Sequence, residues 1–175
     1  LSIWVYYFFR DPERISINDE NYLTSPADGE VLMVHEVDGP KELGLEGKKF
    51  TKISIFMNVF DCHVNRTPCE GKISEILYKP GKFINASLDK ASEDNERNYY
   101  KIINNQAEEV IVVQIAGLIA RRIVCESSKD QQLQQGERIG MIRFGSRADV
   151  YFENYETLVK VGQKTIAGET LLAKR

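Results

Sequence analysis

The chain has no long hydrophobic run, few cysteines and no surplus of positive charge. Its 175 residues include three cysteines, two histidines and one tryptophan, and the formal net charge is -3. This charge disfavours a nucleic-acid partner. Cys62, Cys69 and Cys125 are an odd set without paired C-x-x-C spacing, which predicts small core residues in a reducing compartment rather than a disulfide framework. No metal site is predicted.

The N-terminal segment is short, apolar and aromatic. Residues 1–9 read LSIWVYYFF and stop at Arg10, and nine residues are too few to cross a bilayer, which takes about 20. Tryptophan and tyrosine beside an arginine are typical of a membrane interface. We expect residues 1–10 to be the end of an N-terminal membrane-associating segment, with further chain upstream of Leu1. A buried first strand or helix is the alternative.

Turn signals built on glycine and proline recur at short intervals along the whole chain. Between them lie β-branched and aromatic runs, most clearly at residues 52–57, 71–78 and 109–115, which predict a mainly β protein. Residues 85–98 are polar without apolar periodicity and predict a loop with a short helical turn. With 42% apolar residues, the length suits a single domain over residues 1–175.

Two segments at opposite ends of the chain look related. Residues 25–32 and 159–171 both resemble the strand-turn-strand units of lipoyl- and biotinyl-type domains. This resemblance implies a barrel-sandwich hybrid of β-hairpins with few short helices. Carrier domains display a modified lysine at a hairpin tip, but the corresponding turns here carry Gly29-Glu30 and Ala167-Gly168. A non-enzymatic lipoyl-like binding module is therefore kept only as an alternative.

One of the two histidines is placed for chemistry. His35 lies within a predicted strand, where a structural or surface role is expected. His63 follows an apolar strand in the polar turn DCHVNRTP, where an imidazole could act as a general acid or base. A structural role for His63 is the alternative.

The Gly145-Ser146 pair lies between two apolar runs. A Gly-Ser pair is expected about once by chance in a chain of this length, so only its context draws attention. A glycine there can adopt backbone angles closed to other residues and leaves its carbonyl open to attack by the next side chain.

Several separate motifs together resemble the short bacterial and archaeal form of the phosphatidylserine decarboxylase family. They lie in family order over nearly the whole chain, at residues 8–14, 25–29, 60–66, 80–92, 95–97, 114–122 and 143–147. The resemblance implies a self-processing, pyruvoyl-dependent decarboxylase. Such an enzyme converts phosphatidylserine to phosphatidylethanolamine and carbon dioxide through a Schiff base.

The resemblance also implies that the chain is cut between Gly145 and Ser146. A β chain of residues 1–145 and an α chain of residues 146–175 result, and Ser146 becomes the covalent pyruvoyl group, so that no external cofactor is needed. A serine hydroxyl needs a base, and the base needs an orienting acceptor. His63 and Asp28 match the family's motif residues and are the candidates. His63 is also the candidate acid for decarboxylation.

Arg66 departs from the pattern of the longer bacterial members, which carry a second histidine there. Arginine is permanently charged near neutral pH and cannot act as a base, so either His63 serves both steps or another group or a water shares them. Arg66 is a candidate for binding the substrate phosphate or carboxylate, with a structural ion pair as the alternative. The other candidates for headgroup binding are Asn85, Lys90 and Arg97.

The expected partners are phosphatidylserine, a membrane surface and the two chains of one proenzyme, and the resemblance is compatible with a homodimer. We expect a peripheral position on the cytoplasmic side of the cell membrane. Diacyl and archaeal ether lipids both stay open as substrates, because the reacting headgroup is the same. The rival enzyme is a serine hydrolase with an Asp28/His63/Ser146 triad on an intact chain, although Ser146 lacks the G-x-S-x-G elbow.

Overall fold

The computed structural model describes residues 2–118 and 122–175, and these form a mainly β protein with 44% strand and 8% helix. The elements in chain order are α1 (Ser2–Phe8), β1 (Tyr22–Thr24), β2 (Gly29–Asp38), the 3-10 helix η1 (Lys41–Leu43), β3 (Lys49–Met57), β4 (Val64–Arg66), β5 (Gly71–Lys79), α2 (Ala91–Asp94), β6 (Arg97–Asn104), β7 (Glu109–Ile115), β8 (Ile123–Cys125), β9 (Gln132–Leu133), β10 (Arg138–Ile142), β11 (Ser146–Phe152), β12 (Glu156–Thr157), β13 (Lys164–Thr165) and β14 (Leu171–Lys174). Leu1 and the part of the 114–122 motif at residues 119–121 lie outside the described residues. The predicted β class is confirmed, and β3, β5 and β7 contain the three strongest predicted strands.

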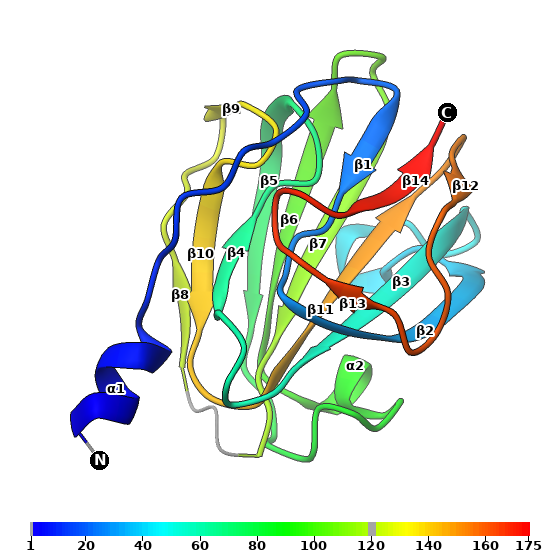
Figure 1. The fold of residues 1–175 in the computed structure, drawn as a ribbon. Coiled ribbons are helices and arrows are strands. Elements are labelled where there is room, and N and C mark those ends of the chain that lie inside the picture. Colours follow the sequence, from blue (N-terminus) through cyan, green and yellow to red (C-terminus); the bar gives the residue numbers. More distant parts are fainter. Residues whose placement is uncertain (1, 119–121) are drawn as a thin grey trace.

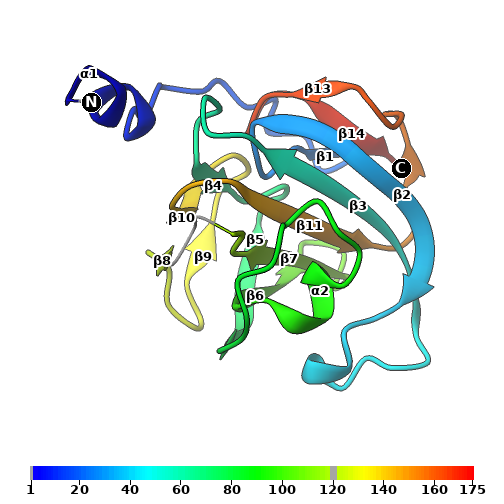
Figure 2. The same cartoon turned by 90° about the horizontal axis from the view of Figure 1, so that it is seen from below.

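Eight strands form one curled sheet in the order β13-β2-β3-β11-β7-β6-β5-β9. Figure 2 shows this sheet curling into a half-barrel when it is seen from below. Two three-stranded sheets, β1-β14-β12 and β4-β10-β8, complete the fold. Side chains alternate between the faces of a strand. On β11, Ala148, Val150 and Phe152 therefore enter the main core, whereas Tyr151 joins a smaller apolar cluster.

The two lipoyl-like segments lie side by side. Strand β13 pairs antiparallel with the start of β2, with Lys164 opposite Glu30. The backbone of Ser25 exchanges hydrogen bonds with the second segment, because its N–H donates to the Thr170 carbonyl and its carbonyl accepts from the Gly168 N–H, each at 2.8 Å. This interleaving of the two ends of the chain agrees with the predicted barrel-sandwich architecture.

Four segments, three of which carry His63, Gly145-Ser146, and Asn85 with Lys90, meet at one end of the sheet, the lower end in Figure 1. They are helix α1, the β3–β4 connection, the β10–β11 turn and the loop that contains α2. The polar region 85–98 forms the predicted loop with one short helix, α2. The N-terminal aromatic segment forms α1, and no helix within residues 2–118 and 122–175 is long and apolar enough to span a bilayer.

Candidate active site

The turn between β10 and β11, directly before Ser146, contains one residue in a strained conformation. Phe144 and Gly145 both have positive φ angles, 63° and 50°. For a residue with a Cβ this left-handed conformation costs about 1 kcal/mol or more. Ser146 then begins β11 opposite Met57 of β3. Its hydroxyl is buried and has no hydrogen-bond partner among the described residues, so nothing described competes for the oxygen.

His63 lies next to this turn. Its carbonyl accepts a hydrogen bond of 3.2 Å from the N–H of Ile142, the last residue of β10. The ring Nδ1 is 2.9 Å from the Asp61 carbonyl oxygen. A carbonyl can only accept, so Nδ1 carries the hydrogen and Nε2 keeps its lone pair. Nε2 is buried and has no partner in the described part of the chain, which leaves it free to accept a proton.

The aromatic side chain of Phe8 covers His63. The fully buried Phe8 ring of α1 lies 4.4 Å from the His63 ring and 4.4 Å from the Phe144 ring, measured between ring centroids. Burial lowers the pKa of His63 from 6.5 to about 4, because charging the ring in this setting is costly. The Asp61 carbonyl and the charge of Asp28 partly oppose the shift. His63 is therefore a neutral base at neutral pH.

Asp28 occupies a position near His63 but bonds to other groups. Its carboxylate pairs with the Arg14 guanidinium at 2.9 Å and accepts a hydrogen bond of 2.8 Å from the Ala167 N–H. The orienting acceptor of the His63 ring is the Asp61 carbonyl instead. Asp28 thus acts on the imidazole through its negative charge, which favours the protonated ring, and it joins the N-terminal and C-terminal segments of the site.

Arg66 is engaged inside the fold, so its position does not support the expectation that it binds substrate. The guanidinium donates to the carbonyl oxygens of Gly136 at 2.9 Å and Pro12 at 3.0 Å, and it pairs with Asp11 at 3.3 Å. The side chain is 8% exposed. These contacts fix the segment after α1 against the body of the protein, which is the structural alternative considered for this residue.

Arg97 is likewise buried among partners of its own. It forms an ion pair of 2.7 Å with Glu42 and donates a hydrogen bond of 2.7 Å to the Tyr99 hydroxyl. Its expected role in headgroup binding is therefore not supported. By contrast, Asn85 and Lys90 are exposed in the loop around α2, so both can reach a ligand at the lower end of the molecule.

A buried ion pair fixes this loop to β11. Arg147, the residue after Ser146, pairs with Asp149 at 2.7 Å and donates to the Leu88 carbonyl at 3.2 Å and to the Ser92 hydroxyl. Burial alone would raise the pKa of Asp149, but the Arg147 guanidinium outweighs this and holds it below its usual value. The pair thus ties residues 86–92 to the strand that begins at Ser146.

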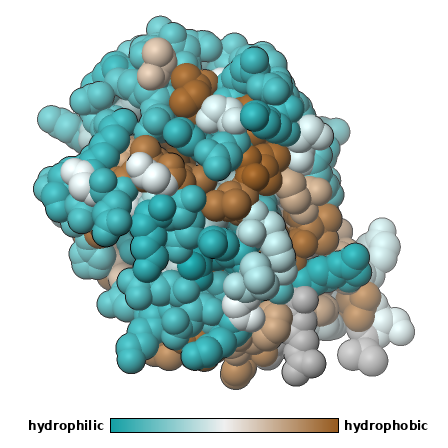
Figure 3. Space-filling model, turned by 180° about the vertical axis from the view of Figure 1, so that it is seen from behind, coloured by the Kyte–Doolittle hydropathy of each residue, from teal (hydrophilic) through white to brown (hydrophobic). Residues whose placement is uncertain are grey.

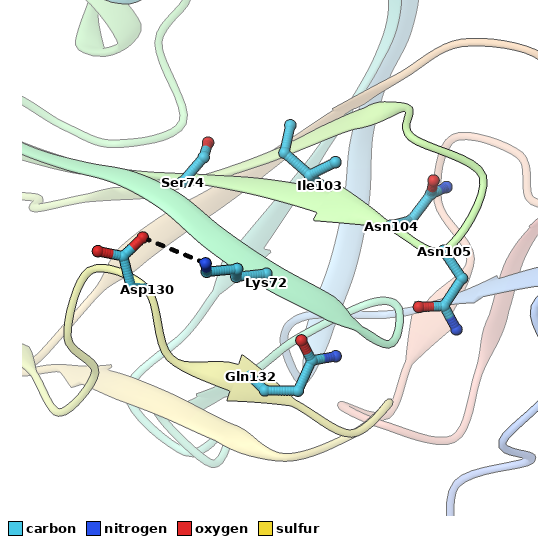
Figure 4. A pocket seen from close by; sticks show the side chains of 7 residues that line it. All are labelled: Lys72, Ser74, Ile103, Asn104, Asn105, Asp130 and Gln132. Atoms are coloured by element: carbon cyan, nitrogen blue, oxygen red, sulfur yellow. Dashed lines mark ion pairs between the residues drawn. The ribbon is translucent and has the colours of Figure 1, made fainter.

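The hollow shown in Figure 4 is not part of this site. It has a volume of about 420 Å³ and lies over β5, β6 and β9, where Lys72 and Asp130 form an ion pair of 3.6 Å. None of the predicted site residues lines it.

Three features of the site were not predicted from the sequence. They are the Phe8 cover, the Asp61 acceptor and the Arg147–Asp149 pair. The Phe8 cover depends on a contact between segments and the Asp61 acceptor on a backbone atom, neither of which has a signature in local sequence, whereas Arg147 and Asp149 lie two residues apart on β11 and form a pair that local sequence could have suggested. Phe8 was visible only as part of an aromatic run. The three cysteines are free, with Cys62 and Cys69 buried as predicted and Cys125 exposed.

Comparisons with known proteins agree on one family. The sequence model of the family described as phosphatidylserine decarboxylase matches residues 1–173. A phosphatidylserine decarboxylase proenzyme of Pelagibacter ubique is 94% identical over 175 residues, which is 100% of this chain and 81% of the relative. Proenzymes of the same name from Ruegeria pomeroyi and Cereibacter sphaeroides are 57% and 53% identical over 174 residues, covering 99% of this chain and 80% and 75% of those relatives.

Proposed function

The chain belongs to the phosphatidylserine decarboxylase family, and we propose that it becomes active by cutting itself between Gly145 and Ser146. It is a decarboxylase made as a proenzyme, which converts phosphatidylserine to phosphatidylethanolamine and carbon dioxide. The observation that carries the self-cleavage proposal is the buried Ser146 hydroxyl without a described partner, directly after two residues of positive φ.

Self-cleavage begins with attack of Ser146 Oγ on the Gly145 carbonyl carbon. His63 Nε2 takes the hydroxyl proton, the Gly145–Ser146 C–N bond breaks, and the freed amine of Ser146 gains a proton, which leaves an ester. The attack is intramolecular and the nucleophile is already held beside its target, so little orientational entropy is lost.

The second stage removes the β chain. Loss of the Ser146 α-proton and breakage of the Cβ–Oγ bond release Gly145 as a carboxylate and leave dehydroalanine at residue 146. Addition of water and loss of ammonia then give the ketone of the pyruvoyl group. The residues present fit this group, because the Ser146 side chain lies in a buried position without a described competing hydrogen bond.

When formed, the pyruvoyl group supplies a carbonyl that condenses with the substrate amine and withdraws electrons as carbon dioxide leaves. The protein supplies the surroundings. His63 Nε2 is unprotonated at neutral pH and can release only a proton that it has first taken up, and with such a proton it is our candidate for protonating the product carbon. Because Arg66 is bound to Asp11, Pro12 and Gly136, we assign both proton transfers to His63 in succession.

The same end of the molecule is our candidate for contact with a membrane. Large apolar side chains are exposed there on α1, after β7 and in the β3–β4 connection, namely Ile3, Tyr6, Leu118 and Phe60. Figure 3 shows hydrophobic residues along this lower edge of the molecule. Asn85 and Lys90 lie exposed in the adjacent loop, where they can bind the phosphate or carboxylate of a headgroup. We also propose a peripheral position on the cytoplasmic leaflet, because the three cysteines are free thiols, as is usual in a reducing compartment.

The two rival functions are not favoured. Ser146 begins a β-strand after a turn rather than lying on the strand-turn-helix of a hydrolase elbow, and Asp28 bonds to Arg14 and Ala167 instead of the His63 ring. A lipoyl-like carrier domain would need a lysine at the hairpin tip, and the turn around Gly29 has none.

Intact-mass analysis of the purified protein tests the proposed cleavage. We expect the wild-type chain to give two fragments, residues 1–145 and a fragment beginning at residue 146 that is blocked as a pyruvoyl group. Ser146→Ala should give one uncut chain, because it has no nucleophile. Only full-length protein from the wild type would refute self-cleavage.

Variants of the two histidines form a matched pair for this experiment. His63→Ala should stay uncut, because the base is lost. His35→Ala should be cut like the wild type, because His35 is exposed on β2. Equal loss of cleavage in both variants would contradict the role assigned to His63.

A further inference from the structure

Gly117 lies directly against the bond proposed to be cut. Strands β7 and β11 pair antiparallel, with Arg147 opposite Ile115. Two residues further along the same register, Gly145 comes opposite Gly117. The two glycines therefore face each other where the sheet ends and the cleavage turn begins.

The Gly145 carbonyl occupies the place that a side chain at residue 117 would take. A Cβ added to Gly117 would come 1.9 Å from the Gly145 carbonyl oxygen and 3.1 Å from its carbon. Ordinary contacts between carbon and a carbonyl oxygen are about 3.3 Å or longer. Any side chain at residue 117 would therefore displace the carbonyl by about 1 Å or more.

The backbone conformation of Gly117 does not itself demand glycine. Its φ lies outside the left-handed region, unlike that of Gly145. The close approach of the Gly145 carbonyl therefore excludes a Cβ at residue 117, whereas the backbone angles of residue 117 would allow one.

Hydrogen bonds fix the chain around this contact. The Asn95 side chain donates to the Ala116 carbonyl at 2.7 Å, which fixes the residue before Gly117. The same amide donates to the Ile84 carbonyl at 2.7 Å, so one buried side chain connects residues 84 and 116. Ala86 is also close, because its Cβ lies 3.2 Å from the position of the added Cβ.

We propose that Gly117 is a positioning residue for self-cleavage, because its lack of a side chain allows the Gly145 carbonyl to lie against residue 117, in place for attack by Ser146. This inference rests on the proposed cleavage between Gly145 and Ser146. We assign Gly117 neither a proton transfer nor a contact with the attacking oxygen. Its contribution is the location of the carbon that is attacked.

Gly117→Ala tests the proposal, with Gly71→Ala as the matched control. At Gly71, where β5 begins, an added Cβ would also meet a backbone carbonyl oxygen, that of Ile103, at 2.4 Å. Gly71 also lacks a left-handed φ, so both variants introduce the same kind of collision. We expect Gly117→Ala to slow self-cleavage about 100-fold, since a displacement of 1 Å can cost about this factor. Gly71→Ala should be cut within about threefold of the wild-type rate.

Rates come from intact mass over time, and stability comes from thermal unfolding of both variants in a Ser146→Ala background, where no chain is cut. Similar melting temperatures with a selective loss of cleavage in Gly117→Ala would support positioning. Equal cleavage rates in the two glycine variants would overturn it. If the wild-type protein itself stays uncut, the proposed self-cleavage fails, which is a separate outcome.

A second variant covers the case in which Gly117→Ala does not fold. Gly117→Ala combined with Ala86→Gly removes the methyl group that lies 3.2 Å from the new one. We expect this double variant to fold and to be cut at least tenfold more slowly than Ala86→Gly alone, because the methyl group still displaces the Gly145 carbonyl. Equal rates would overturn the proposal.

Discussion

His63 depends on its surroundings for the protonation state that the proposed chemistry needs. Burial lowers its pKa to about 4, and the positive charge of Arg10 acts in the same direction, whereas the Asp61 carbonyl and Asp28 act against it. A base must be unprotonated to accept the Ser146 proton. The buried ring therefore stays competent in mildly acidic conditions under which an exposed histidine is largely charged.

The pH dependence of self-cleavage should report this burial. We expect the wild-type rate to stay level from about pH 8 to about pH 5 and to fall as the pH approaches the His63 pKa of about 4. In Phe8→Ala water reaches the ring, so the pKa should rise towards its ordinary value of 6.5. The rate of this variant should then already fall below about pH 6.5. Initial rates from intact mass across this pH range measure the shift.

Tyr6→Ala is the control for this experiment, because Tyr6 lies on the same helix with 87% of its surface exposed. Its pH profile should match that of the wild type. A wild-type profile in Phe8→Ala would mean that Phe8 does not shield the base or that His63 is not the base.

At the scale of elements, helix α1 contacts the site on one side and exposes apolar side chains on the other. Phe8 is buried against His63 and Phe144, whereas Ile3 is 88% exposed. Arg10 follows the helix and lies over the Tyr7 ring at 3.9 Å. Exposed apolar and aromatic residues beside a cation suit the boundary between lipid headgroups and acyl chains.

Binding to lipid vesicles tests this role of α1. The double variant Ile3→Ser and Tyr6→Ser should bind vesicles of phosphatidylserine and phosphatidylcholine at least tenfold more weakly than its Ser146→Ala parent, because each buried large side chain contributes about 1.5–3 kcal/mol. Co-sedimentation with the uncut Ser146→Ala chain measures the partition coefficient without turnover of the lipid.

A control pair of exposed apolar residues lies away from α1. Ile15 is 89% exposed and Val161 is 64% exposed, so Ile15→Ser with Val161→Ser changes exposed hydrophobicity without changing the helix. This control should bind like the Ser146→Ala parent. Equal weakening in both double variants would mean that α1 is not the docking element.

At the scale of the whole molecule, the proposed cut falls inside a continuous sheet. The fragment of residues 146–175 contains β11, which pairs with β3 on one side and β7 on the other. It also contains β13, paired with β2, and β14, paired with β1. Every residue of β11 is buried, so separating the fragments would expose core surface and many backbone hydrogen bonds.

We therefore expect the two chains to remain together after cleavage. Size-exclusion chromatography in native buffer should give one peak containing both fragments, and the fragments should separate only in denaturant. Mass analysis of each fraction identifies them. Elution of the 146–175 fragment by itself in native buffer would show that strand pairing does not hold the processed protein together.

The sequence predicted the mainly β class and the three strongest strands, because alternating and β-branched runs report local structure directly. The β-branched run at residues 109–115 matches β7 in full. The motif order also identified Ser146 and His63 as the candidate pair. It did not distinguish Asn85 and Lys90, which are exposed in the structure, from Arg66 and Arg97, whose buried side chains form ion pairs within the protein.

Only the tertiary structure decided how the site is assembled. It gave His63 a backbone acceptor at Asp61 and an aromatic cover from Phe8, and it brought Gly117 against the Gly145 carbonyl. These contacts join segments that are distant in the chain or involve backbone atoms, which every residue has. In the sequence alone, the Gly145-Ser146 pair is no more than chance would produce. In the structure, the register of β7 and β11 places Gly145 opposite Gly117, because strand pairing fixes which distant residues face each other.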